Sequence, residues 1–157
     1  MPSFERPTDP DIAPSPWVCR HAALIRADGE VLDLACGSGR HARWLLGQGF
    51  RVLAADIDVS RVEDLRGADR VEILQADLEV SPWPLAGRRF DGIVVANYLH
   101  RPHFGLLTAA LREGGVLIIE TFAAGNELLG RPRNPAFLLQ PGELLDAFAG
   151  TLQIVAF

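Results

Sequence analysis

The stretch that most constrains this chain runs from Val31 to Ala42 and reads Val-Leu-Asp-Leu-Ala-Cys-Gly-Ser-Gly-Arg-His-Ala. Residues 31–35 predict a buried strand, because Asp33 is the one polar residue among them. Gly37 and Gly39 end this strand, and apolar residues then recur at helical spacing. Glycine lets a backbone approach a ligand closely, and the helix that follows presents free N–H groups. We therefore expect a strand, a glycine turn and a helix around a ligand site.

The same alternation continues along the chain. Residues 51–56, 71–75, 90–96, 116–121 and 152–157 predict further strands. Helices are expected at residues 17–25, 104–111 and 143–148, and the pair Ser60 and Glu63 predicts a capping box at the start of a short one. This order favours a doubly wound, Rossmann-like α/β fold with a mostly parallel sheet and helices on both faces. Ligands of such sheets bind beyond the carboxyl ends of the strands.

Length and composition limit the classes of protein to consider. The 157 residues suit one domain, which we place at residues 17–157 behind a proline-rich leader at residues 1–16. A net charge of −5 disfavours a nucleic-acid partner. The chain shows neither a signal peptide nor an apolar run of membrane-spanning length, so we expect a cytoplasmic protein without a membrane partner. Cys19 and Cys36 lack the spacing of a disulfide framework or a zinc site, so no metal is expected.

The glycine motif is compatible with two kinds of ligand. Gly37-x-Gly39-x-x-Ala42 matches a dinucleotide fingerprint, and Asp56 lies 19 positions after Gly37, where a ribose-binding acid is expected. A dinucleotide-binding oxidoreductase is therefore one hypothesis. However, a carboxylate at Asp33 would repel a pyrophosphate and attract an ammonium or sulfonium group. The third predicted strand is followed by another acid, Asp77, which could accept a hydrogen bond from an adenine amine. Acids at three successive strand ends favour a cationic nucleoside.

Taken together, these motifs resemble the class I S-adenosylmethionine (SAM)-dependent methyltransferase family from Val31 to Thr121. The run Arg112-Glu-Gly-Gly-Val-Leu-Ile matches the family's turn before its fifth strand. The resemblance implies SAM as cofactor, with Asp56 on the ribose hydroxyls, Ile57 against the adenine, and the backbone from Gly37 to Gly39 beside the methionyl group. The cofactor-binding residues that it implies are Asp33, Ala35, Gly37, Gly39, Asp56, Ile57, Ala76, Asp77, Leu78 and Asn97.

The acceptor side is expected where polar residues follow the fourth strand. Tyr98 and His100 are the candidate catalytic residues, although displacement at a sulfonium can proceed without a general base. The segment from residue 120 to 137 is too long for a simple connection and predicts a lid, in which Arg131 and Arg133 could meet an anionic acceptor. Glu120-Thr-Phe and the loop after it resemble tellurite-resistance and thiopurine-type methyltransferases, which implies a small-molecule acceptor.

One departure from the family concerns the end of the sheet. The family's sheet finishes with an antiparallel strand pair, whereas residues 152–157 leave no segment for a seventh strand. The terminal pair is thus expected to be incomplete. An exposed apolar edge favours a homodimer through that edge. The incomplete pair also leaves open a third hypothesis, a SAM-fold protein that binds a ligand or partner without catalysis.

Overall fold

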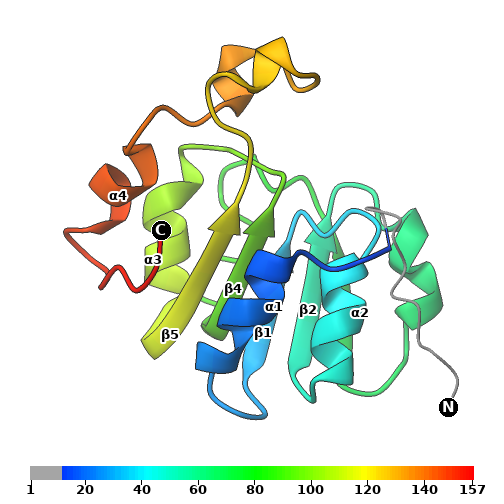
Figure 1. Cartoon of the computed structure of the whole chain (residues 1–157). Coiled ribbons are helices and arrows are strands. Elements are labelled where there is room, and N and C mark those ends of the chain that lie inside the picture. Colours follow the sequence, from blue (N-terminus) through cyan, green and yellow to red (C-terminus); the bar gives the residue numbers. More distant parts are fainter. Residues whose placement is uncertain (1–11) are drawn as a thin grey trace, which may run out of the picture.

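Five parallel strands form one sheet in the order β3-β2-β1-β4-β5 (Figure 1). The structure is a computed structural model that describes residues 12–157, so residues 1–11 of the expected leader lie outside the described residues. The strands are β1 (Glu30–Leu34), β2 (Arg51–Asp56), β3 (Val71–Gln75), β4 (Phe90–Ala96) and β5 (Leu111–Glu120). The doubly wound parallel fold predicted from the alternating pattern is confirmed. Strand order reverses between β1 and β4, and ligands of such sheets bind at this switch point.

Helices cover both faces of the sheet. The α-helices are α1 (Pro16–His21), α2 (Arg40–Gly47), α3 (His103–Ala110) and α4 (Glu143–Phe148). The shorter 3-10 helices are η1 (Ala22–Leu24), η2 (Ser60–Leu65), η3 (Asn126–Leu128) and η4 (Pro135–Phe137). One core lies between the sheet and α1, η1, α2 and η2, and a second lies between the sheet and α3. None of the helices within residues 12–157 combines the length and apolarity that a membrane crossing requires.

Alternate residues of the strands supply these two cores. Val31 of β1 points into the core under α2, whereas Leu32 and Leu34 point into the core under α3. All three are fully buried, because a parallel strand in the middle of a sheet is covered on both faces. The apolar run at residues 31–35 is therefore what the strand's position demands.

Three local predictions differ from the structure. Residues 152–157 form no strand, because the backbone N–H groups of Thr151 and Leu152 both donate to the Phe148 carbonyl and no described strand pairs with the residues that follow. The capping box is also absent: η2 is capped at Val59 without a side-chain bond, and the Ser60 N–H donates to Asp58 instead. Finally, β5 begins earlier than predicted, because Leu111 already pairs with Phe90 ahead of an irregularity in the register.

Candidate functional site

The two glycines of the turn after β1 have different surroundings. Ala35, Gly37 and Gly39 all adopt positive φ angles, of 55°, 52° and 77°. A Cβ atom added to Gly37 would meet no atom within 4 Å, so this backbone faces open space. A Cβ atom added to Gly39 would lie 2.3 Å from Cγ1 of Val62, which is fully buried in η2. Gly37 thus leaves room for a ligand, whereas Gly39 is required by close packing.

Asp33 is a buried carboxyl group below this turn. This residue is 1% exposed, and its Oδ2 has no hydrogen-bond partner among residues 12–157. Burial raises the pKa of Asp33 to about 7, against smaller lowering effects of the Ala42 backbone and the Arg40 charge. A buried oxygen without a donor is costly, so the site gains from a cationic or N–H group brought close to it. This observation fits the ammonium group of SAM better than a pyrophosphate.

The carboxylate of Asp56 connects the ends of β1 and β2. Its Oδ2 accepts a hydrogen bond from the Gly37 N–H at 2.9 Å, and its Oδ1 accepts one from the Asp58 N–H at 3.1 Å. Each carboxylate oxygen can accept a further bond, so hydroxyl groups of a ligand can still be held. Ile57, the next residue, is 63% exposed. An apolar side chain presented to solvent beside this carboxylate provides a surface on which a flat ring can pack.

The segment after β3 lies beside the end of β2. The Ala76 N–H donates to the Asp56 carbonyl at 3.0 Å, and Asp77 Oδ1 accepts from the Glu79 N–H at 2.9 Å. Leu78 is buried, and its carbonyl contacts Nε2 of His103 at 2.8 Å. Ala76 and Asp77 are therefore held at the same edge of the sheet as Asp56, while Leu78 presents its backbone to α3.

Polar groups from the ends of β3 and β4 meet on the expected acceptor side. Asn97 is exposed, has a φ of 55°, and donates its N–H to the Glu120 carbonyl at 2.8 Å. The Tyr98 hydroxyl donates to Glu79 Oε1 at 2.8 Å, and His100 Nδ1 lies 3.7 Å from the same oxygen. Burial and then the bond to Glu79 raise the pKa of Tyr98. A carboxylate thus sits between the two candidate catalytic side chains.

Sequence reasoning missed Glu79 and His103 as part of this cluster. His103 is 3% exposed, and its ring lies 4.4 Å from that of His100. Burial lowers the pKa of His103, and its Nδ1 has no partner among the described residues. The sequence held one signal for Glu79, because it is a second acid only two positions after Asp77. Its contact with Tyr98 depends on chain packing and leaves no local pattern.

Arg101 fastens the segment after β5 to the body of the protein. Its guanidinium forms two bonds to the Glu143 carboxylate, at 2.5 and 3.1 Å, and donates to the carbonyls of Ala136 and Leu138. Arg131 and Arg133 are exposed. The structure thus explains how this segment is held, while its closure over an acceptor stays a prediction.

The thiol of Cys36 is unsuited to nucleophilic chemistry. It is 6% exposed, and burial, followed by the nearby Asp33 charge, raises its pKa to about 12. A thiol in this state is protonated at neutral pH and lacks the reactivity of a thiolate. Within residues 12–157 no group of three or more histidine, cysteine or acidic side chains is arranged to hold a metal ion.

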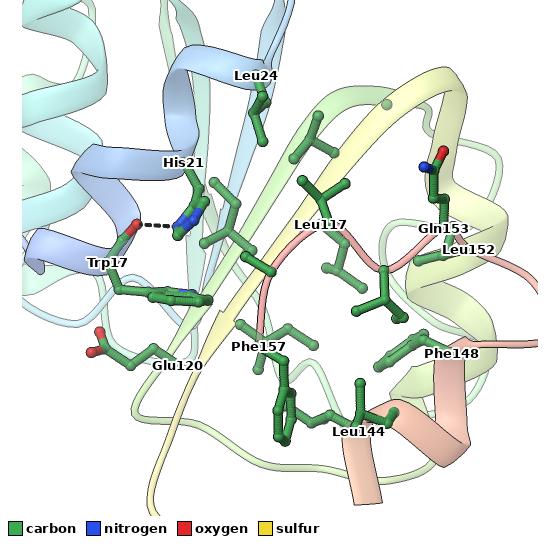
Figure 2. Close-up of a pocket in the computed structure, with 18 of the residues that line it drawn as sticks. Trp17, His21, Leu24, Leu117, Glu120, Leu144, Phe148, Leu152, Gln153 and Phe157 are labelled. Atoms are coloured by element: carbon green, nitrogen blue, oxygen red, sulfur yellow. Dashed lines mark hydrogen bonds between the residues drawn. The ribbon is translucent and has the colours of Figure 1, made fainter. Parts of the chain in front are cut away.

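A cavity of about 740 Å³ lies along the outer edge of β5, separate from the glycine turn. Figure 2 shows Trp17 and His21 of α1 on one side of it, and Leu144 and Phe148 of α4 on the other. The tail at residues 152–157 completes the wall, with Phe157 itself 76% exposed. The lining is mostly apolar, and β5 has a strand partner on one side only within the described residues. The exposed sheet edge expected from the sequence is thus present and borders a hollow.

Comparison with known proteins identifies methyltransferases as similar to this chain. A family model described as a methyltransferase domain matches residues 31–115, more than half of the chain. A demethylmenaquinone methyltransferase of Clavibacter sepedonicus is 33% identical over 111 residues, which cover 64% of this chain and 44% of the relative.

Two solved structures extend the comparison. A TehB-like SAM-dependent methyltransferase from Corynebacterium glutamicum has a TM-score of 0.55 and 27% identity, covering 66% of this chain and 60% of that one. The 1,6-didemethyltoxoflavin-N1-methyltransferase of Burkholderia thailandensis, with 1,6-didemethyltoxoflavin and S-adenosylhomocysteine bound, has a TM-score of 0.61 and 24% identity, covering 83% and 62%. The chain therefore spans less than two thirds of each of these three relatives. None of the three is named as an oxidoreductase.

Proposed function

Because the chain belongs to the methyltransferase domain family, we propose that it transfers the methyl group of SAM to a small-molecule acceptor by direct displacement. The observation that carries this proposal is the buried Asp33 carboxyl, whose Oδ2 lacks a hydrogen-bond partner in the described part of the chain, below a glycine turn whose Gly37 faces open space. The relatives support the same cofactor, since one is named as SAM-dependent and another contains S-adenosylhomocysteine.

Different residues at the carboxyl edge of the sheet would contact different parts of SAM. SAM, when bound, supplies a methyl group already activated on a sulfonium, so the protein mainly aligns the reactants and excludes water. Asp56 would hold the ribose hydroxyls, and Ile57 would pack on the adenine. Asp77 would accept a hydrogen bond from the adenine amine. The methionyl group would be bordered by Ala35, Gly37 and Gly39, and Asp33 would attract its ammonium. Ala76 and Leu78 would border the adenine. What supports these assignments is the parallel order of β3, β2 and β1, because parallel strands bring their carboxyl ends to one edge of the sheet.

On the acceptor side, Asn97 and Tyr98 would border the sulfonium and the acceptor. An acceptor whose nucleophilic atom carries a proton must lose it when the methyl group is transferred, and His100 would receive that proton. Oε1 of Glu79 lies 3.7 Å from Nδ1 of His100. The small-molecule class is supported by the Burkholderia thailandensis relative, whose structure contains 1,6-didemethyltoxoflavin. The resemblance to tellurite-resistance and thiopurine-type enzymes stays part of the proposal.

Isothermal calorimetry with SAM and S-adenosylhomocysteine tests the cofactor. We expect Asp56→Ala to abolish measurable binding, because both its bond to Gly37 and its contacts to the ribose are lost. Asp58→Ala is the matched control, because that exposed acid bonds only to its own turn. Binding of NAD in place of SAM would support the oxidoreductase hypothesis instead. Transfer of a radioactive methyl group from SAM to members of an acceptor panel would then exclude the non-catalytic hypothesis.

We further propose that a second copy of the chain covers the cavity beside β5. A strand in a sheet occupies about 3.3 Å of length, 4.8 Å of width and 10 Å of thickness per residue, so 740 Å³ accommodates a strand of about five residues. Light scattering after size exclusion should show a concentration-dependent dimer. Val155→Glu with Phe157→Glu should weaken it, since both side chains are exposed at the cavity, whereas Leu106→Glu on α3 should not. A monomer at every concentration would refute this proposal.

The remaining parts of the proposal concern location and chain organisation. Two free cysteines are consistent with a reducing cytoplasm, and the net charge of −5 argues against a nucleic-acid partner. We keep the division into a leader at residues 1–16 and a SAM-binding domain at residues 17–157. Immunoblotting of the intracellular and the secreted fractions checks the location.

A further inference from the structure

We propose that the segment after β5 docks onto an anionic lipid bilayer through a tip made of Leu128, Leu129, Arg131 and Arg133. The two leucines are 85% and 89% exposed, more than the other large apolar side chains of residues 12–157. Figure 1 shows that this segment rises beyond the carboxyl ends of β4 and β5, away from the helices that cover the sheet. Two adjacent leucines held in water at the end of a projection gain free energy when an apolar medium covers them.

The arginines of the tip give it a local positive charge. Neither Arg131 nor Arg133 forms an ion pair or a hydrogen bond with another residue of the part of the chain that the structure describes. Glu127 is the acid of this tip, and its Oε2 already accepts the Gly125 N–H at 2.7 Å. Unpaired arginines beside exposed leucines are the composition that binds the interface of anionic membranes.

The tip has a defined backbone. The Asn126 side chain donates to the Pro132 carbonyl at 3.1 Å, and its own carbonyl accepts the N–H groups of Leu129 and Gly130. Arg101 holds the far end of the segment through Ala136, Leu138 and Glu143. Because hydrogen bonds already hold the backbone of the tip, docking would restrict few further residues, and the entropic cost of docking is correspondingly small.

Acidic residues lie at the same edge of the sheet from which the tip projects. Asp56 ends β2, Asp58 follows it, and Asp77 and Glu79 follow β3, with Glu79 reaching Tyr98 after β4. Figure 1 shows the segment after β5 projecting beyond the carboxyl ends of the strands, so a surface meets the tip ahead of these strand ends. Salt screens the repulsion between the acids and an anionic surface beyond a Debye length of about 8 Å. The carboxyl edge of the sheet would then face the bilayer.

The size of the tip argues for lipid over a protein partner. A stable protein interface buries about 800 Å² on each side and draws on some 20 residues. Two leucines and two arginines at the end of a projection supply a small fraction of that area. Reversible binding to a bilayer interface, in contrast, has no minimum contact area, because its strength scales with the apolar area buried and with the attraction of cations to anionic lipid.

Cosedimentation of the full chain with vesicles tests the proposal. We expect binding to vesicles of phosphatidylcholine mixed equally with phosphatidylglycerol, and little binding to phosphatidylcholine alone. Arg131→Gln with Arg133→Gln should weaken binding by about fivefold per arginine, and Leu128→Ser with Leu129→Ser by about tenfold or more. The matched control is Leu106→Ser with Arg89→Gln, which alters exposed residues outside both the tip and the cavity beside β5 and should bind as the unaltered chain does.

Equal binding to both kinds of vesicle, or unaltered binding by both tip variants, would overturn the proposal. A change of native mass in the tip variants would also overturn it, because the tip would then contact protein. Calorimetry with SAM on the same variants separates this proposal from the proposed function, since the tip variants should retain the cofactor affinity of the unaltered chain.

Discussion

Replacing each glycine of the turn after β1 by alanine should have opposite consequences for stability and for ligand binding. Both residues have positive φ angles, so an alanine at either position costs about 1–2 kcal/mol of backbone energy. At Gly39 the new Cβ would also lie 2.3 Å from the buried Val62 side chain, and forcing such overpacking costs a further 1–3 kcal/mol or so. Gly39→Ala should therefore destabilise the protein by about 2–5 kcal/mol, and Gly37→Ala by about 1–2 kcal/mol.

Urea unfolding followed by circular dichroism measures both values, because the midpoint shifts in proportion to stability when the slope is unchanged. A rescue variant makes the reasoning specific. Val62→Ala alone should cost about 2 kcal/mol for the lost methyl groups and the space they leave. Combined with Gly39→Ala, it should cost clearly less than the sum, because the shorter side chain admits the new Cβ.

The binding assay should rank the two variants in the opposite order. Gly37 faces open space, so a methyl group there obstructs a ligand while leaving the fold almost unchanged. Gly37→Ala should lose most of its affinity for SAM in calorimetry. Equal destabilisation by the two alanines, full additivity with Val62→Ala, or unchanged SAM affinity of Gly37→Ala would refute this division of roles.

Three further predictions concern other parts of the molecule. Burial raises the pKa of Asp33 from 3.8 to about 7, so the contribution of Asp33 to stability falls as pH rises across that range. Burial lowers the pKa of His41 from 6.5 to about 4, so the contribution of His41 rises with pH between those values. Asp33→Asn removes the first effect, so the free energy of unfolding of this variant should rise from pH 4 to 6.5 by up to about 1.4 kcal/mol per pH unit. Urea unfolding at pH 5 and 7 measures this, and equal values at the two pH values would contradict it. Arg101→Ala should release the segment after β5 and speed tryptic cleavage after Arg133 several-fold, whereas Arg89→Ala should not; an unchanged cleavage rate would count against the anchoring role of Arg101. Tyr98 is the single tyrosine, and its pKa is raised by burial and by Glu79. In Glu79→Gln the absorbance of the tyrosinate should therefore appear at a lower pH than in the unaltered chain. An unchanged titration curve would show that Glu79 has no influence on the hydroxyl.

Local patterns were enough for the framework of the fold. The strands β2, β3 and β4 have the bounds predicted from their sequences. β2 and β4 are covered on both faces and are therefore mostly apolar, whereas β3 lies at the end of the sheet and its residues are only partly buried. The positions of Asp33, Asp56 and Asp77 after or near strand ends follow from the same runs. Parallel strands bring their carboxyl ends to one edge, so the sequence could also place these acids on a common side of the sheet.

Contacts between distant segments were beyond such patterns. Residues 152–157 have a strand-like composition, but they pair with no strand of the described residues, and a strand forms only where a neighbour supplies its hydrogen bonds. The contact of Glu79 with Tyr98 and the packing of Val62 against Gly39 each join residues about 20 positions apart. The raised pKa of Asp33 likewise depends on every element that excludes water from it. Periodicity in a chain records which face of each element is buried, whereas hydrogen-bond partners, close packing and desolvation are set by the other segments that surround each residue.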